Sequence, residues 1–543
     1  MKYKTLALIL TLLLSGCQLT SLTNSDDNLT TNEPETASPE DVNQALLVDE
    51  SIDVIHPVED IDFKLTDNVV MVSNNIWQRI RNQLKFNIPE NPRVARERNW
   101  YVKHPNYLDR IAKRAEPFMY YILQQLKAND MPVEMALLPI VESAYDPFAY
   151  SHGRASGMWQ FVPDTGKRFG LKQNWWYDGR RDVIASTKSA IAYLKYLHDF
   201  FNDDWLLALA AYNSGEGRVQ RAVRENARKH KPTDFWSLDL PAETRAYVPK
   251  LLALADIVKR PEKFNIDLYE LENASVISTV DVKSQIDLAK AAEMADISLA
   301  ELQRLNPGFN RWATAPKGPH YLVLPKKKIK QFTGELAKLE PKDRINWQRY
   351  KIRNGDSLTE IAQHFHTSTT LIKQINGLSS NMIRKGKYLL IPVASVSLDR
   401  YILSKDQRLV TKQRKRHNGI KTVYHVKSGD TLWDIGNAFH VSSSKLAKWN
   451  GIAPRDMLKP GQKLVIWQKT EFQLSERKLT GIIDNAVIRN IRYRVRSGDS
   501  LARIANKFNI TIADIERWNN VSRQKYLQPG QILKLSVDVT NDI

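Results

Sequence analysis

The chain has 543 residues, a length expected of about three to four domains. Its hydrophobic share of 42% and charged share of 26% are those of a globular protein that can bury a sizeable core. The single cysteine excludes an internal disulfide and a Cys-based zinc cluster, whereas the formal charge of +19 fits an acidic polymer, an anionic membrane surface or nucleic acid as a partner.

Residues 1–16 are predicted to be a secretory signal peptide. A short positive head precedes the apolar run of residues 6–14, which is too short to span a bilayer as a helix. The run ends in Leu14-Ser15-Gly16-Cys17, which resembles a bacterial lipobox. The resemblance implies that the chain is cleaved before Cys17 and that acyl chains on this thiol anchor the protein in a membrane. A signal peptide with an incidental cysteine is the other interpretation.

The segment after the anchor differs in character from the rest of the chain. Residues 17–70 are acidic and polar with little apolar material, so we predict a flexible tether. Gln18 rather than Asp follows the cysteine, and by resemblance to Gram-negative lipoproteins this favours the periplasmic side of the outer membrane.

Residues 71–265 are predicted to form a mainly α-helical domain, called the helical domain below. Few runs in it alternate with period two, and apolar residues recur instead at helical spacing. One such stripe consists of Tyr107, Ile111, Phe118, Ile122 and Leu126.

One carboxylate in the helical domain lies in an unusual setting. Residues 132–144 are nearly all apolar, which predicts a buried helix with a kink at Pro139. Glu142 lies near the C-terminal end of this helix, where burial and the helix dipole both raise the pKa of a carboxyl group. An acid that is protonated near neutral pH can donate a proton to a leaving group. The alternative is a Glu142 paired with an arginine in a structural salt bridge.

Other segments of the helical domain carry candidate functional residues. Trp175-Trp176-Tyr177 are predicted to pack, with some exposure to a cleft, although stacking on a sugar ring is the alternative. Capping or turn roles are favoured for the remaining candidate carboxylates, since one precedes a proline and another begins a predicted helix. These carboxylates are Asp146, Asp164, Asp178 and Asp182.

The C-terminal part of the chain is repetitive. Residues 348–393, 422–467 and 491–536 each open with Tyr-x-Val/Ile, continue with Gly-Asp-Ser/Thr-Leu and close with a late glycine before an apolar run. The Asp of Gly-Asp precedes an Asn by 20 residues in each copy and the late glycine by 30, 31 and 31 residues. This pattern predicts a strand–helix–helix–strand unit. Residues 270–326 resemble a fainter fourth copy that lacks Gly-Asp.

Basic segments lie between the copies. Residues 326–328 and 412–416 are rich in Lys and Arg, and we predict solvated linkers, with attraction to an anionic wall polymer as a secondary hypothesis. The histidines show no spacing typical of metal ligands, so we expect no metal and no cofactor.

The repeats resemble the LysM module, which binds glycans containing N-acetylglucosamine. The three copies are called LysM 1 (348–393), LysM 2 (422–467) and LysM 3 (491–536) below, and residues 270–326 the LysM-like module. The resemblance implies glycan contacts around the Gly-Asp turns. These are Gly355 and Asp356, then Gly429, Asp430 and Thr431, then Gly498 and Asp499.

Three motifs of the helical domain occur in the order found in lytic transglycosylases of goose-lysozyme-like fold. They are Glu142-Ser143, the Gly-x-x-Gln of Gly157 to Gln160, and Ala211-Tyr212-Asn213-Ser214-Gly215. The resemblance implies a multidomain protein with a mainly α lysozyme-like catalytic domain followed by small α+β LysM modules. It implies Glu142 as the catalytic acid/base. The substrate-binding residues that it implies are Ser143, Ser151, Met158, Gln160, Tyr212, Asn213 and Tyr247.

The implied reaction is cleavage of the β-1,4 bond between N-acetylmuramic acid and N-acetylglucosamine in peptidoglycan, leaving a 1,6-anhydro end, in cell-wall remodelling or turnover. Trp159 departs from the family pattern, which puts the local shape of the cleft in doubt. The expected partners are peptidoglycan strands and, through Cys17, a membrane. We expect a monomer that binds no nucleic acid, because the lipobox places the chain outside the cytoplasm. The alternatives are a hydrolytic muramidase with a second carboxylate and a non-catalytic wall-binding lipoprotein.

Overall fold

The computed structural model describes residues 74–468, 488–496, 499–508, 510–519, 521 and 527–538. The predicted signal peptide and tether, Cys17 and Gly498 lie outside the described residues. No helix among the described residues is both long enough and apolar enough to cross a bilayer.

The helical domain is built around long apolar helices, as expected. Helix α11 packs against α2, α3 and α9, and one continuous core of buried Ile, Leu, Val, Ala and aromatic side chains runs through the domain. Asp182 and Asp204 cap the N-termini of α8 and α9 by accepting hydrogen bonds from backbone N–H groups. The elements are α2(Ile76–Gln83), α3(Pro92–Val102), α4(Pro105–Ala115), α5(Met119–Ala128), η1(Val133–Leu137), α6(Leu138–Ser143), α7(Pro163–Arg168), α8(Val183–Phe200), α9(Trp205–Ser214), α10(Glu216–Arg228), η2(Phe235–Ser237), α11(Ala242–Lys259) and η3(Pro261–Phe264).

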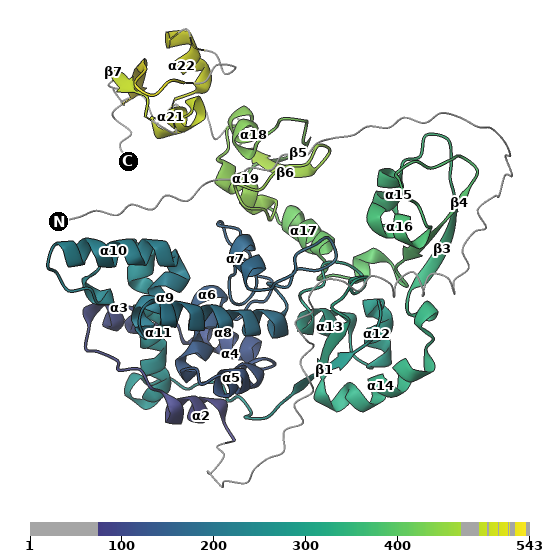
Figure 1. The fold of residues 1–543 in the computed structure, drawn as a ribbon, viewed down its shortest axis with the longest axis horizontal. Coiled ribbons are helices and arrows are strands. Elements are labelled where there is room, and N and C mark those ends of the chain that lie inside the picture. Colours follow the sequence, from purple (N-terminus) through teal and green to yellow (C-terminus); the bar gives the residue numbers. More distant parts are fainter. Residues whose placement is uncertain are drawn as a thin grey trace, which may run out of the picture.

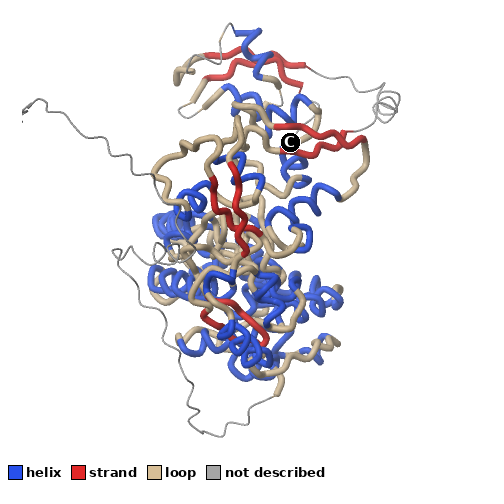
Figure 2. The backbone as a smooth tube through the Cα atoms, turned by 90° about the vertical axis from the view of Figure 1, so that its right-hand side faces the viewer, coloured by secondary structure: helices blue, strands red, loops and turns tan. Residues whose placement is uncertain are grey.

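The rest of the described chain holds four strand–helix–helix–strand units, each with its own two-stranded antiparallel sheet. In Figure 2 the strands appear as separate pairs, while most helices gather in the lower part of the molecule. The LysM-like module has β1(Ile277–Asp281), α12(Leu288–Met294), α13(Leu299–Leu305) and β2(Tyr321–Pro325). The other units are β3(Asn346–Lys351), α15(Leu358–His364), α16(Thr369–Ile375) and β4(Tyr388–Val393); β5(Ile420–His425), α18(Leu432–Ala438), α19(Ser443–Trp449) and β6(Lys463–Gln468); and β7(Ile488–Arg494), α21(Leu501–Lys507), α22(Ile512–Asn519) and β8(Ile532–Asp538).

The constant Asp-to-Asn spacing has a structural cause. In LysM 2, the side chain of Asn450 donates to the carbonyls of Leu446 and Val465 and accepts from the Val465 N–H, so it joins the second helix to the closing strand. The same clamp is made by Asn376, Asn519 and, in the LysM-like module, Asn306. The fourth copy is therefore a true structural repeat.

The LysM-like module is packed firmly against the helical domain. Its Ile277, Leu305 and Val323 belong to the core of the helical domain. The buried carboxylate of Asp182 accepts hydrogen bonds from Tyr177 at 2.9 Å and from Tyr321 of the module at 2.7 Å. These two regions therefore share a continuous interior.

The two basic segments predicted to be linkers are instead parts of helical elements. Residues 326–328 form η4(Lys326–Lys328), which leads into α14(Ile329–Lys338) and the short η5(Pro341–Arg344). Residues 412–414 end α17(Lys405–Arg414), which follows η6(Leu398–Arg400) and, in Figure 1, lies between the LysM-like module and LysM 2. Gln413 is buried against LysM 2, where its side chain donates hydrogen bonds to Asn450 and to the carbonyl of Lys463. The prediction of a linker is therefore wrong for residues 412–414, which are helical, whereas the basic side chains of Lys412 and Arg414 are exposed as predicted.

Candidate active site

Glu142 lies one residue before the end of α6. The expected kinked helix over 132–144 is instead a 3-10 turn, η1, followed by α6, and Pro139 lies in the first turn of α6, where its missing N–H needs no partner. Ala144 ends the helix in the left-handed conformation with φ of 52°. The abrupt end places Glu142 beside α11.

In the part of the chain that the structure describes, Tyr247 is the side chain that donates a hydrogen bond to the Glu142 carboxylate. Tyr247 Oη donates to Glu142 Oε1 at 2.5 Å. Burial raises the pKa of Glu142 to about 7; the Tyr247 bond lowers it, Glu243 raises it and Lys250 lowers it. Among the described residues, Glu142 forms no ion pair with an arginine, which argues against the structural salt bridge.

Several residues from the predicted motifs lie around the acid. Ser143 Oγ donates to the carbonyl of Met158 at 3.0 Å, and Tyr212 Oη donates to the carbonyl of Trp159 at 2.8 Å. Burial, and then the charge of Glu142, raise the pKa of Tyr212 well above its ordinary value. The Glu-Ser, Gly-x-x-Gln and Tyr-Asn motifs, which are distant in sequence, are thus joined by hydrogen bonds.

Trp159, the departure from the family pattern, does not shape an exposed surface. Its side chain is fully buried, and its indole N–H donates to Thr187 Oγ1 at 3.1 Å. The doubt about local cleft shape is removed for this residue, which belongs to the core.

Gln160 and Asn213 have partners of their own. Gln160 has a φ of 48°, and its side-chain amide donates to the carbonyl of Gly157 at 2.7 Å. Asn213 Oδ1 accepts from Thr244 Oγ1 at 2.8 Å. Sequence reasoning missed Thr244 and its neighbour Glu243, because they lie in the first turn of α11 and no local motif marks them.

Ser151 lies on a short hairpin, and within the described residues no hydrogen bond joins it to Glu142. Ser151 N–H donates to the carbonyl of Ala155 at 2.9 Å, and Ala155 N–H donates to Ser151 Oγ at 3.0 Å. The hairpin comprises residues 149–157 and is called the Ser151 hairpin below. It closes where the Gly157 N–H donates to the carbonyl of Ala149 at 3.0 Å. The hydrogen bonds of the hairpin therefore fix the position of Ser151.

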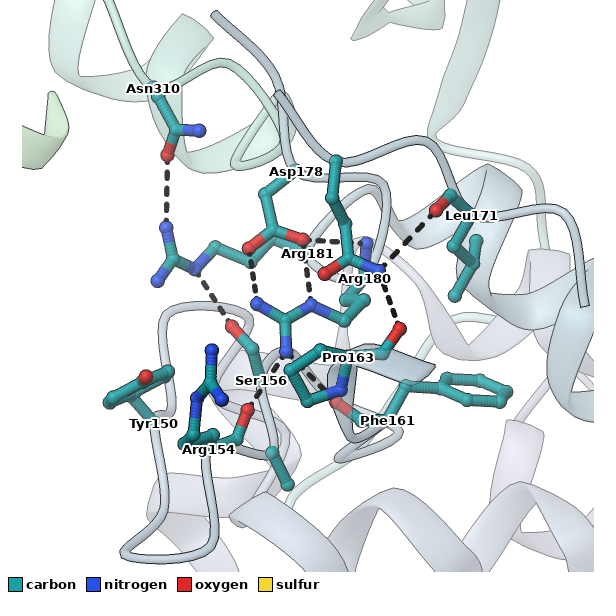
Figure 3. Close-up of polar contacts among 12 residues, drawn as sticks. Tyr150, Arg154, Ser156, Phe161, Pro163, Leu171, Asp178, Arg180, Arg181 and Asn310 are labelled. Atoms are coloured by element: carbon teal, nitrogen blue, oxygen red, sulfur yellow. Dashed lines mark hydrogen bonds and ion pairs between the residues drawn. The ribbon is translucent and has the colours of Figure 1, made fainter. Parts of the chain in front are cut away.

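Two buried arginines support this hairpin from inside the helical domain (Figure 3). Arg180 binds the Asp178 carboxylate through two hydrogen bonds of 2.9 and 2.8 Å and donates to the carbonyl of Arg154 at 2.8 Å. Arg181 donates to Ser156 Oγ at 3.0 Å. Bidentate guanidinium–carboxylate geometry is rigid, so it fixes the base of the hairpin.

Three of the four candidate second carboxylates make structural contacts. Asp146 accepts from the N–H of Phe148, as expected for a turn. Asp164 lies in the first turn of α7 but does not cap it, because that helix has no side-chain cap hydrogen bond. Burial opposes ionisation of Asp178, but Arg180 and Arg181 together outweigh it and lower the pKa of this carboxyl group. Asp182 caps α8.

The aspartates of the Gly-Asp motifs close turns inside their modules. Asp430 Oδ2 accepts from Tyr424 Oη and from the N–H of Lys427, both at 2.7 Å. Asp356 and Asp499 make the same contacts in their own modules. Thr431 caps α18 by accepting from the Asp434 N–H at 3.1 Å. Because the same turn is repeated in all three modules, the Gly-Asp motif is explained by its role in folding. Glycan contact by these side chains stays a prediction.

The aromatic segment 175–177 packs, as favoured from the sequence. Trp176 and Tyr177 are buried, and they contact Trp312 and Phe309 of the LysM-like module with ring centroids 5.7 and 5.5 Å apart.

Among the described residues, one group has the spacing needed to hold a metal ion. It consists of His198, Asp199 and Asp203 at the end of α8, whose potential ligand atoms lie within 4.8 Å of one another.

Parts of the chain match known protein families and known proteins. Residues 119–235 match the transglycosylase SLT domain, residues 276–341 match the LysM-like domain of the lytic transglycosylase MltD, and residues 350–392, 424–467 and 493–536 match the LysM domain. An autolysin of Enterococcus faecalis is 29% identical over 173 residues, which cover 32% of this chain and 22% of the autolysin. The solved 70 kDa soluble lytic transglycosylase Slt70 of Escherichia coli is 20% identical, with 32% of each chain covered and a TM-score of 0.23.

The match to one further relative extends over most of both chains. Membrane-bound lytic murein transglycosylase D of Escherichia coli K12 is 38% identical over 405 residues, which cover 73% of this chain and 86% of the relative. The matched families follow one another in the order of the observed units, from the helical domain through the LysM-like module to the three repeats. The chain therefore belongs to the membrane-bound lytic murein transglycosylase D family, and it is a peptidoglycan lytic transglycosylase with LysM repeats.

Proposed function

We propose that Glu142 is the single acid/base of the reaction and that the product ends in 1,6-anhydromuramic acid. The observation that carries this proposal is the environment of Glu142: a carboxyl group whose pKa burial raises to about 7, with Tyr247 as its hydrogen-bond donor. Such a group holds a proton near neutral pH and can take one back afterwards.

The reaction proceeds in two proton transfers. Protonated Glu142 gives its proton to the oxygen between N-acetylmuramic acid and N-acetylglucosamine, and the bond from C1 of the muramic residue to that oxygen breaks. The Glu142 anion then takes the proton from the C6 hydroxyl of the same muramic residue, and the oxygen of that hydroxyl forms a bond to C1. The glucosamine hydroxyl leaves, Glu142 is protonated again, and no water is consumed. Tyr247 stabilises the intermediate anion by its hydrogen bond.

The remaining motif residues are proposed to bind the glycan. Gln160 and Asn213 would provide polar support for the developing charge in the transition state. Ser143, Met158 and Tyr212 would shape the site around Glu142, since hydrogen bonds connect their segments. Ser151 would contact the glycan from its hairpin.

Product analysis tests this proposal. Isolated sacculi are digested with the full chain, and the released fragments are weighed by mass spectrometry, because an anhydro end is lighter than a reducing end by one water. We expect anhydro products from the wild type and none from Glu142→Gln, with sacculus binding retained. Glu262→Gln, an exposed glutamate, is the matched control and keeps the activity. Reducing ends from the wild type would instead support a hydrolytic muramidase. Sacculus binding without cleavage would support a wall-binding lipoprotein.

The lipid anchor is a separate proposal that the sequence carries. Cys17 would be acylated and would hold the enzyme at the periplasmic face of the outer membrane, where cell-wall remodelling takes place. We expect Cys17→Ala to move the protein from the membrane fraction to the soluble fraction. Equal membrane association of the variant would contradict the anchor.

A further inference from the structure

The Ser151 hairpin is held from two sides by different parts of the chain. From within the helical domain, Arg180 binds the carbonyl of Arg154 and Arg181 binds Ser156 Oγ. On its other side the hairpin faces LysM 2 with the side chains of Tyr150 and Arg154, which lie side by side (Figure 3). Ser151 lies between these two residues in the chain, so contacts that hold their side chains also restrain Ser151.

Asp456 of LysM 2 binds both of these side chains. Tyr150 Oη donates to Asp456 Oδ2 at 3.0 Å, and Arg154 Nε lies 2.9 Å from Asp456 Oδ1. Ser444 of LysM 2 adds a contact of 3.3 Å between its Oγ and His152 Nε2. The carboxylate is itself fixed, since Oδ2 also accepts from the Ala453 N–H at 2.8 Å, and only 19% of the side chain is exposed.

Helix α17 fixes where LysM 2 lies. At its start, the Lys405 N–H donates to the carbonyl of Asn310 at 2.9 Å in the LysM-like module. In its middle, the Arg408 guanidinium lies 4.7 Å from the ring centroid of Phe148, next to the hairpin. At its end, Gln413 donates to Asn450 of LysM 2 at 2.9 Å. The helix thus connects three parts of the molecule at fixed separations, and Asp456 reaches the hairpin as a consequence.

Of the three LysM repeats, LysM 2 is the one with a carboxylate at the position of Asp456. Counting back five residues from the late glycine gives Asn381 in LysM 1, Asp456 in LysM 2 and Lys525 in LysM 3. Neither an amide nor an ammonium group could form the ion pair with Arg154. The three repeats are therefore not interchangeable at this contact.

We propose that Asp456 is a positioning residue of the transglycosylase: LysM 2 braces the Ser151 hairpin, so that Ser151 meets the glycan in the correct place. This inference rests on the proposed role of Ser151 in substrate binding. LysM 2 thereby acts as a structural part of the active site in addition to binding the cell wall. A loosened hairpin weakens glycan binding more than it slows proton transfer, because Glu142 lies on α6 and is untouched.

Steady-state kinetics of the full chain on isolated glycan strands tests the proposal. We expect Asp456→Ala to raise KM by about fivefold and to leave kcat within about twofold, as for a partly buried ion pair. Arg154→Ala should have the same effect, and the double variant should be no worse than either single variant. Asn381→Ala, at the same position of LysM 1, is the matched control and leaves KM unchanged.

Charge reversal separates positioning from a general loss of structure. Arg154→Asp or Asp456→Arg alone should raise KM, and the two together should lower it below that of either single reversal. Recovery is partial, because an arginine side chain cannot accept the hydrogen bonds of Tyr150 and the Ala453 N–H. Melting temperatures identify any variant that fails to fold, and Asp456→Asn, which keeps the size of the side chain, then replaces Asp456→Ala.

Three outcomes would overturn the proposal: an unchanged KM in Asp456→Ala and Asp456→Asn, additive losses without rescue by charge reversal, or a higher kcat/KM, which would identify the contact as autoinhibitory. If the wild type released no anhydro products, the proposed function itself would fail, which is a distinct result.

Discussion

If Glu142 is the acid/base, as proposed, Glu142 and Tyr247 should set the pH at which the enzyme works. Because burial raises the pKa of Glu142 to about 7, the group is protonated and able to act as an acid below that pH and is ionised above it. The alkaline limb of kcat/KM should therefore lie near pH 7. Tyr247 donates to the ionised form and so holds the pKa lower than burial alone would.

Removing the Tyr247 hydroxyl should move this limb. In Tyr247→Phe the Glu142 anion loses its hydrogen bond, its pKa rises, and the alkaline limb moves to higher pH by about one unit. A pH series of kcat/KM checks this. Tyr212→Phe is the control for the position of the limb, because Tyr212 donates to the carbonyl of Trp159 and not to Glu142. A limb that stays in place or moves down in Tyr247→Phe would contradict the assignment.

The same pKa predicts a pH-dependent stability. A carboxyl whose folded pKa lies above its unfolded value of 4.5 stabilises the fold fully below pH 4.5, and that contribution is lost as the pH rises through about 7. Glu142→Gln has no such loss. We expect the variant to melt at the same temperature as the wild type near pH 4.5 and to be more stable above pH 7, by on the order of 1–3 kcal/mol. A difference that is equal at both pH values would argue against a buried acid.

At the scale of the element, the Ser151 hairpin depends on one glycine. Gly157 has a φ of +83°, and a Cβ built on it would lie 1.8 Å from the carbonyl oxygen of Arg180. Gly157→Ala should therefore displace the hairpin and lower the stability of the helical domain by about 2–4 kcal/mol. Gly153→Ala is the matched control, because its Cβ would meet only Ser151 Oγ at 3.8 Å. Thermal unfolding followed by circular dichroism compares the two, and equal melting temperatures would contradict the expected clash.

Elements held by local contacts were predictable from the sequence, and those held by distant contacts were not. The repeats were found because the Asn clamp and the turn-closing Asp act within each module, at fixed spacing. Trp159 lies in a turn, and its burial could not be predicted because its partner Thr187 lies on the separate helix α8. Likewise, residues 412–414 look like a linker by composition, and only Asn450 and Lys463 of LysM 2 make them the end of a packed helix.

At the scale of the whole molecule, the helical domain does not end where its helices end. Trp176 and Tyr177 share a buried cluster with Phe309 and Trp312 of the LysM-like module, and this cluster includes Leu371, Ile375 and Tyr401 from the region of LysM 1. LysM 2 and LysM 3 have separate cores of their own. The molecule thus combines a large cooperative body with modules that are attached to it.

This division predicts different effects of truncation. A chain that ends after residue 468 lacks LysM 3 but keeps every element of the large body, so its main melting transition should match that of the full chain. A chain that ends after residue 275 exposes Trp176 and Tyr177 and leaves the buried carboxylate of Asp182 without the hydroxyl of Tyr321. Loss of apolar burial at about 25 cal/mol per Å², together with the loss of one hydrogen bond to Asp182, should lower its melting temperature strongly or prevent folding. Differential scanning calorimetry of both truncated chains measures this, and a helical domain that melted unchanged in the chain ending after residue 275 would show that the LysM-like module is only an attachment.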